Sequence, residues 1–467
     1  MADSADSRDI AAHVAAVVDA VEPYMPPGNE PGAEALRDRL HGRLRIALMG
    51  RVNAGKSTLL NALVGQRIAP TNETECTQVA TWYRYGAPAR VDVIGRDGSQ
   101  TSTALSRRLP DDLGRPPADI DYAVAHVPSA LLRDYEIIDT PGLGSMNSTS
   151  TAATRRILLG ASADDGLERP DVILFLCDNI PRADETDFLS ELGASRINTV
   201  ALLSHADTFG EGVFGSEDPL LMAAAHAARL KSQLPGVAGA VVPVSGLLAE
   251  TALTGHLTET DALALANLAC HDEFELADLL GSGDAELDRL AGLVGEYGIV
   301  HGRAVAKQGA AAVTHWLADK SGLSAVRDQI LRRFVRRSDL LKARRILMAL
   351  RKVGDASANR SQIFDILERT HLDPALHPLR ELSALDLMLQ WDPTHPLVER
   401  LDELTLSATR AERLGLESDA ADEAAITAAA KEAWVGCRRE RAIAISAAER
   451  EAWTVLERSY QLALQPE

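Results

Sequence analysis

The residues best suited to chemistry form a glycine-rich run that ends in lysine and serine. It reads Gly50-Arg51-Val52-Asn53-Ala54-Gly55-Lys56-Ser57 and follows the apolar stretch Leu44–Met49. Glycines let a backbone turn tightly around phosphates, and N–H groups at a helix start point toward negative charge. In this pattern the lysine reaches the β- and γ-phosphates, and the serine ligates Mg²⁺. The run predicts a nucleoside triphosphate site held by Gly50, Asn53, Ala54, Gly55, Lys56, Ser57 and Thr58.

A second motif predicts the remaining metal ligands. Asp139-Thr140-Pro141-Gly142 follows the apolar run Tyr135–Ile138, so Asp139 is expected beside the metal and the Gly142 amide beside the γ-phosphate. Between the two motifs lies Thr74-Glu75-Cys76-Thr77-Gln78. Thr77 is the preferred hydroxyl for completing the Mg²⁺ shell, with Thr74 and Thr71 as alternatives. The predicted metal ligands are therefore Ser57, Thr77 and Asp139.

A third motif concerns the base. Ser204-His205-Ala206-Asp207 follows the apolar run Thr199–Leu203, and Asp207 is placed to accept hydrogen bonds from N1 and N2 of guanine, donors that adenine lacks. The usual pattern has lysine where this chain has His205, whose imidazole could stack on the base. Ser245-Gly246 stands where a backbone N–H contacts the guanine O6, although a strand that simply turns would end in the same way. GTP is the expected substrate.

Strand-like and helical segments alternate around these motifs. Between residue 44 and about residue 246, short apolar runs (44–49, 91–94, 135–138, 172–177, 199–203 and 240–244) are separated by helical stretches. This pattern predicts an α/β P-loop domain, a mostly parallel sheet with helices on both faces. After residue 250 the chain reads as helices, and residues 419–464 as one long helix of a neck or trunk bundle. The expected domains are 1–43 (N-terminal helices joining the neck), 44–320 (GTPase domain with a helical extension) and 321–467 (neck and trunk).

Composition narrows the possible partners. The formal charge is −19, and 46% of residues are hydrophobic but only 4% aromatic, which favours a soluble, helix-rich protein and opposes nucleic-acid binding. Asp3, Asp6 and Asp9 stand where a signal peptide would carry basic residues. No window is apolar enough for a membrane span, and the four cysteines have no paired spacing. A cytoplasmic protein with at most peripheral membrane contact is expected.

The motifs resemble those of bacterial dynamin-like GTPases, and among these the mycobacterial isoniazid-inducible proteins are the most similar. The similar stretches are 50–63, Glu75-Cys76-Thr77, Thr81-Trp82-Tyr83-Arg84-Tyr85-Gly86, Pro181-Arg182-Ala183-Asp184, Ser321-Gly322-Leu323 and 337–343, so the resemblance covers roughly 44–350. It implies a GTP hydrolase with a hinged helical neck and trunk, heads that pair across the nucleotide, and a tip that touches anionic lipid. It further implies fission or fusion of membranes at the inner face of the cell membrane.

Two departures bear on catalysis. Eukaryotic dynamins carry at the Val52 position a glutamine that helps to hold the attacking water, and small Ras-like enzymes carry a glutamine at the Leu143 position. Backbone groups, Asn53, Thr77 or a residue of a partner head must then hold the water. The expected catalytic residues are Lys56, Thr77, Asn53 and Gly142. Arg51 either stabilises charge or is simply solvated.

Two segments are candidates for lipid contact. The basic segment 327–352 holds ten lysines and arginines, and the proline-punctuated segment 371–396 is apolar. A trunk helix whose basic face pairs with the chain's own acids explains the first equally well, and core packing explains the second.

Two other functions fit the same motifs. A ribosome-assembly or translation GTPase shares the phosphate loop, but such proteins carry a basic RNA-binding module, which this sequence lacks after residue 250. A GTP-gated scaffold with little hydrolysis is compatible with Val52 and His205.

Overall fold

A nine-stranded sheet forms the centre of the computed structural model, which describes residues 5–26, 28, 32–70, 79–110, 112–142, 169–234, 238–417 and 422–465. Its strands are β1 (Leu44–Gly50), β2 (Thr81–Tyr85), β3 (Arg90–Gly95), β4 (Gln100–Ala104), β5 (Ile120–Val127), β6 (Tyr135–Asp139), β7 (Val172–Cys177), β8 (Thr199–Leu203) and β9 (Ala240–Pro243). The strand order is β4-β3-β5-β2-β6-β1-β7-β8-β9. Neighbours from β6 to β9 are all parallel, so the predicted mostly parallel sheet is confirmed.

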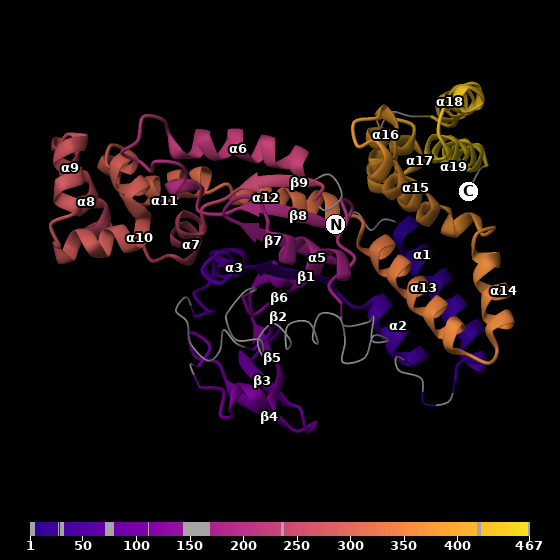
Figure 1. Ribbon diagram of the computed structural model, residues 1–467, viewed down its shortest axis with the longest axis horizontal. Helices are drawn as coiled ribbons and strands as arrows, with labels where there is room; N and C mark the ends of the chain where they lie inside the picture. The colour runs from indigo at the N-terminus through magenta and orange to yellow at the C-terminus, as the bar shows by residue number, and fades with distance from the viewer. Residues whose placement is uncertain are drawn as a thin grey trace.

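Helices cover both faces of the parallel strands. One face packs on α3 (Lys56–Val64), α7 (Gly246–Thr254) and α12 (Leu323–Asp328), and the other on α5 (Ala183–Glu191) and α6 (Pro219–Gln233). Every residue of β7 is buried, because a strand covered on both sides has no solvent-facing positions. Figure 1 shows these helices around the sheet. We call this unit the head.

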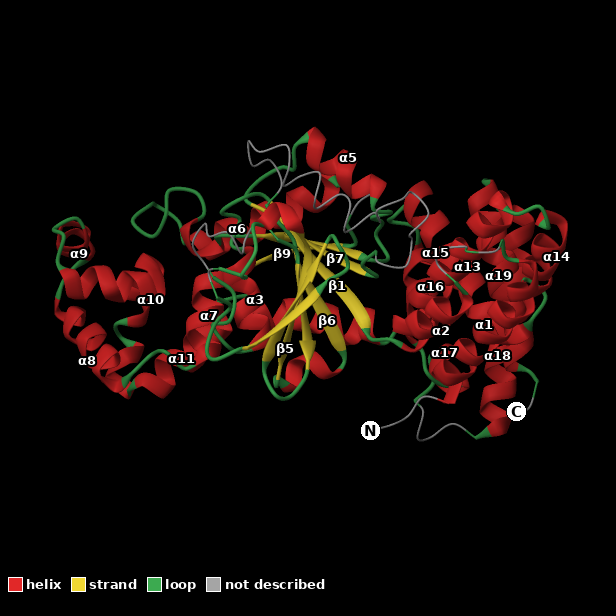
Figure 2. Cartoon of the chain, turned by 90° about the horizontal axis from the view of Figure 1, so that it is seen from below, coloured by secondary structure: helices red, strands yellow, loops and turns green. Residues whose placement is uncertain are grey.

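A helical lobe extends from one end of the head. After α7 it contains α8 (Glu259–Asn267), α9 (Glu273–Leu280), α10 (Ala285–Gly302) and α11 (Ala310–Lys320). Its own core includes Leu265, Leu276, Leu290 and Val313. The lobe lies on the side of the sheet opposite the remaining helices, as Figure 2 shows.

The remaining helices form a neck that joins both ends of the described chain. Its helices are α1 (Ala5–Val21), α2 (Ala33–His41), α13 (Ser338–Ala356), α14 (Arg360–Thr370), α15 (His377–Trp391), α16 (Pro396–Leu406), α17 (Arg410–Arg413), α18 (Glu423–Ile443) and α19 (Ala447–Ala463). A π-helical segment, Gln329–Val335, leads from α12 into α13. Helix α1 packs on α13 and α14, with Val14 and Val18 fully buried. The N-terminal helix α1 thus lies against helices of the neck.

The prediction of one continuous helix over 419–464 is wrong. Helix α18 ends at Ile443, Ala444 is extended, and α19 begins after Ser446, so the two helices pack as a hairpin. The Ser446 hydroxyl accepts from the Glu449 amide at 3.0 Å, an N-cap that starts a new helix. The three-residue connection, Ala444–Ser446, thereby replaces the expected long rod. No helix among the described residues is both long and apolar enough to cross a membrane.

Candidate nucleotide site

The phosphate-type loop leaves β1 under tight steric limits. Gly50 has φ 151°, and a Cβ there would lie 2.5 Å from the Leu176 carbonyl oxygen of β7. Asn53 and Gly55 also have positive φ, 63° and 84°, so the backbone wraps back toward the start of α3. This is the conformation that the glycine spacing predicts. Ala54 lies within the loop, and Ser57 and Thr58 lie in the first turn of α3.

Lys56 closes the loop from inside. Its Nζ donates to the carbonyls of Gly50 at 3.0 Å and Arg51 at 2.7 Å. Burial lowers the pKa of Lys56, and the nearby Asp139 partly opposes this shift. Two carbonyls therefore hold the ammonium group at the loop, with the Asp139 carboxylate near enough to raise its pKa.

Asp139 ends β6 beside this lysine. Burial raises its pKa to about 6, against the opposing effects of Lys56 and of the Thr140 amide. Its Oδ1 is buried and has no hydrogen-bond partner among the described residues. A buried carboxylate oxygen close to a serine-bearing loop is a donor set that Mg²⁺ prefers, so the residues present fit that ion. Thr77, its alternatives Thr71 and Thr74, and Leu143 lie outside the described residues.

The chain after Asp139 is held against the phosphate loop. The Thr140 hydroxyl donates to the Leu48 carbonyl of β1 at 2.8 Å. A Cβ on Gly142 would lie 2.6 Å from Cγ2 of Val52, so only glycine permits this approach. Gly142 therefore lies against Val52 of the loop, and the contact of its amide with a γ-phosphate stays a prediction.

His205 links the base-side loop to the phosphate loop. It follows β8 with φ 55°, and its Nε2 lies 3.1 Å from the Asn53 carbonyl oxygen. With a proton on Nε2 the ring donates a hydrogen bond to that oxygen. In this arrangement the imidazole is a strut between two loops. The hydrogen bond with Asn53 gives no support to the prediction that the His205 ring stacks on the base.

Asp207 lies in a short 3₁₀ turn, Ala206–Thr208, and is 5% exposed. No described residue donates a hydrogen bond to its carboxylate, which leaves both oxygens for a ligand. A kink in α10 approaches it: Gly295 has φ 65°, and a Cβ there would lie 3.4 Å from Oδ2 of Asp207. Gly295 was not among the residues predicted from the sequence. Its only signal is an isolated glycine within a helical pattern.

Ser245 and Gly246, the last residues predicted to contact the base, have different roles in the structure. The Ser245 amide donates to the Ser321 carbonyl at 2.9 Å, and its hydroxyl accepts from the Leu248 amide at 3.3 Å, so Ser245 caps α7. Gly246 is the first residue of α7, where backbone amides have no intrahelical partner. It packs beside Thr58, since a Cβ on it would lie 3.4 Å from the Thr58 Cβ. Gly246 thus keeps the amide that the prediction required.

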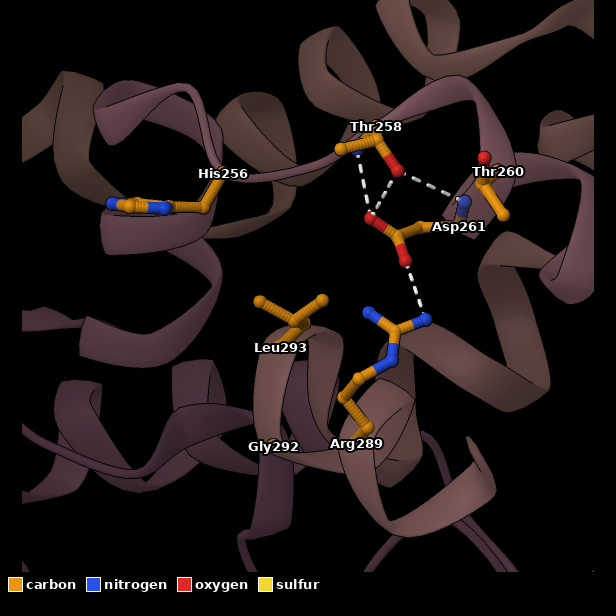
Figure 3. A pocket seen from close by; sticks show the side chains of 7 residues that line it. All are labelled: His256, Thr258, Thr260, Asp261, Arg289, Gly292 and Leu293. Carbon is orange, nitrogen blue, oxygen red and sulfur yellow. Dashed lines mark hydrogen bonds and ion pairs between the residues drawn. The ribbon is translucent and has the colours of Figure 1, made fainter. Parts of the chain in front are cut away.

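Neither Arg51 nor a hollow in the helical lobe contributes much to the candidate nucleotide site. Arg51 lies 4.0 Å from the carboxylate of Asp184, at the limit of an ion pair. The hollow, in the lobe, is shown in Figure 3. There Asp261 accepts from the Thr258 amide at 2.8 Å and pairs with Arg289 at 2.6 Å, which fixes the start of α8 against α10. Its polar groups serve the lobe's own structure.

Comparison with known proteins agrees with this geometry. The profile of the dynamin family matches residues 46–191. The isoniazid-induced protein IniC of Mycobacterium tuberculosis is 35% identical over 380 residues, which cover 75% of each chain. A bacterial dynamin-like protein of Nostoc punctiforme is 31% identical over 141 residues, 27% of this chain and 20% of that one.

The chain also matches solved structures of low sequence identity. One match, 14% identical with a TM-score of 0.38, is a chain from an oligomerised bacterial dynamin pair described as sensing and tethering membranes. The match covers 96% of the present chain. It covers 55% of the chain in the solved structure, so the present chain spans about half the length of that protein.

Proposed function

Because this chain belongs to the dynamin family, as a bacterial dynamin-like protein, we propose that it binds GTP with Mg²⁺ and hydrolyses it to drive movement of the neck. The observation that carries the proposal is that Lys56 of the loop lies near Asp139, whose buried Oδ1 has no hydrogen-bond partner among the described residues, at one edge of the parallel strands. The carboxyl ends of parallel strands are where such folds place their ligands.

In the proposed reaction the phosphate loop supplies position and charge. Lys56 contacts the β- and γ-phosphates, and the amides of Asn53 and Gly142 face the γ-phosphate. Ser57, Thr77 and Asp139 are the proposed Mg²⁺ ligands, and the ion neutralises charge between the β- and γ-phosphates when it is bound. Asp207 and Gly246 read guanine. The valine at position 52 cannot orient water, so backbone groups, Asn53, Thr77 or a paired head must do so.

The neck is attached to the head at the far end of the same strands. Arg345 of α13 donates to the Pro170 carbonyl just before β7, and Lys342 Nζ donates to the Gly42 carbonyl just before β1 at 3.1 Å. Arg39 of α2 forms a buried ion pair with Asp171. We propose that the nucleotide cycle acts on the neck through these attachments, and that heads self-associate during the cycle.

For the membrane we propose peripheral contact through the turn between α18 and α19. Ile443 and Ile445 are 69% and 86% exposed. Arg438 and Arg439, near the end of α18, have side chains 59% and 82% exposed and lie 3.7 Å from Glu457 and 3.6 Å from Glu440, respectively. Exposed branched aliphatic groups with neighbouring arginines suit an anionic lipid surface. The pair α18–α19 lies on the side of α15 away from the sheet, as Figure 1 shows, which leaves the turn accessible.

The two segments singled out in the sequence are less suited to lipid. In 327–352 some of the basic side chains pair internally: Arg337, fully buried, contacts Asp402 at 2.6 Å, and Arg344 contacts Asp386 at 2.7 Å. In 371–396 Leu385 and Met388 are fully buried.

We propose that membrane remodelling, by fission or fusion, takes place at the inner face of the cell membrane.

The test is turnover of GTP and of ATP by the full chain, with and without phosphatidylglycerol vesicles, together with cosedimentation. We expect Mg²⁺-dependent, GTP-selective turnover that Lys56→Ala abolishes. The double variant Ile443→Asp/Ile445→Asp should lose vesicle binding, while Leu221→Asp, an equally exposed site on the head at 71%, should keep it. GTP binding without turnover would favour a nucleotide-gated scaffold. Unchanged vesicle binding by the double variant would refute the lipid assignment.

A further inference from the structure

A cavity of about 300 Å³ lies between head and neck. The head contributes Arg169 and Asp171, which precede β7, and the chain that follows α5. The neck contributes Arg344, Arg345 and Lys352 of α13, and α15 closes one side with Asp386. Any ligand in this cavity would contact both units at once.

The cavity is basic although the chain is acidic. Its described lining carries four cations (Arg169, Arg344, Arg345 and Lys352) and two carboxylates (Asp171 and Asp386), a net charge of +2, against −19 for the whole chain. Both carboxylates already have partners, since Asp171 pairs with Arg39 and with Arg345 of the lining itself, and Asp386 pairs with Arg344. An incoming anion therefore meets excess positive charge.

Arg169 in the lining has an unused donor. Its Nε is buried and has no hydrogen-bond partner among the described residues, whereas the Nε of Arg345 lies 3.5 Å from Oδ1 of Asp171. The one hydrogen bond found for Arg169 is long, 3.5 Å from its Nη1 to the Glu191 carbonyl. Burial lowers the pKa of Arg345 to about 10 and also lowers the pKa of Arg169, because both guanidinium groups are poorly solvated. An anion would relieve that desolvation.

We propose that this cavity binds a small phosphate-bearing anion. Planar guanidinium donors match phosphate oxygens, and the cavity has the volume of a small ligand site. Leu192, Leu341 and Met348 give it an apolar wall, which suits a short carbon skeleton attached to the phosphate. Glycerol phosphate has this chemistry, either as a free metabolite or as the headgroup of a phospholipid. A ligand bound to both units favours the observed arrangement of head and neck.

The first experiment is calorimetric titration of the full chain with glycerol 3-phosphate. Saturating GDP keeps the phosphate loop occupied, and a parallel titration in the Lys56→Ala background removes that loop as a competing site. We expect saturable binding that Arg169→Ala weakens about tenfold. Arg351→Ala removes a charge from an exposed position of the same α13 that does not line the cavity, and it should leave binding unchanged. Met348→Trp, at a position 56% exposed, should fold normally and obstruct the cavity.

The second experiment separates the two sources of the anion. Vesicles of phosphatidylglycerol, with phosphatidylcholine as the control, are titrated against the same variants. Binding of phosphatidylglycerol vesicles that depends on Arg169, without binding of the free phosphate, identifies a headgroup. The proposal is overturned if neither probe binds in an Arg169-dependent manner. Neither readout measures GTP turnover, so this outcome is distinct from a failure of the proposed GTPase activity.

Discussion

Replacing Asp207 by Asn tests the assignment of the base-reading residue. The carboxylate is 5% exposed and has no donor among the described residues, so guanine N1–H and N2–H would be its partners. A hydrogen bond to a charged group contributes about 1.5–3 kcal/mol. The amide keeps one acceptor but presents N–H₂ to the second donor. We therefore expect a loss of about 2–4 kcal/mol, which is roughly a 30- to 700-fold weaker Kd for GTP.

The same substitution should gain affinity for a different base. Xanthine has a carbonyl where guanine has its 2-amino group, and the new amide can donate to that oxygen. Competition between a fluorescent GTP analogue and either GTP or xanthosine triphosphate measures both effects. Asp187→Asn, which removes the same charge from an exposed position of α5, is the control. Retained GTP affinity within about threefold, with no gain for xanthosine triphosphate, would refute the role of Asp207.

Four further predictions concern the loops and the neck. Gly50→Ala should abolish nucleotide binding, as measured by calorimetry, because the new methyl group would meet the carbonyl of β7 at 2.5 Å. His205→Ala removes one hydrogen bond of about 0.5–1.5 kcal/mol and should weaken GTP binding about 2- to 13-fold, whereas an unchanged Kd would show that the strut has no role. Phe334→Ala, at a fully buried position, should cost about 3–5 kcal/mol in urea denaturation. Burial lowers the pKa of His377, so stability should be complete above pH of about 6.5 and fall below it, less so in His377→Gln; denaturation at two pH values checks this.

The sequence predicted the parts of the fold whose signal is local. Six apolar runs became strands, and all of them except β3 lie among the parallel strands, which carry uninterrupted apolar residues because they are covered on both faces. Strands β2, β4 and β5 were not predicted. β4 is exposed at every residue and has the sequence Gln-Thr-Ser-Thr-Ala, so no burial pattern marks it. Its place in the sheet depends on antiparallel pairing with β3, which is a tertiary contact.

The residues of the candidate site also divide into those with a local sequence signal and those that depend on tertiary contacts. The phosphate loop, Asp139 and Asp207 were predictable because their chemistry requires particular residues directly after strands. Gly295 was not, since it approaches Asp207 from a helix 88 positions later in the chain (295 minus 207). The charges of α13 were visible as a basic segment, but their partners were not. Arg337 is fully buried because Asp402, 65 residues away, neutralises it.

The two central strands connect the candidate nucleotide site with the neck. At one end of β1 and β7, Gly50 lies so close to Leu176 that no side chain fits between them. At the other end, Asp171 accepts from the Arg45 amide of β1 at 2.9 Å and also pairs with Arg39 of α2 and, at 3.5 Å, with Arg345 of α13. Fully buried strands resist deformation because the close-packed interior does not yield locally. In the proposed cycle, a displacement of the phosphate loop would therefore reach α2 and α13 as a shift of whole strands.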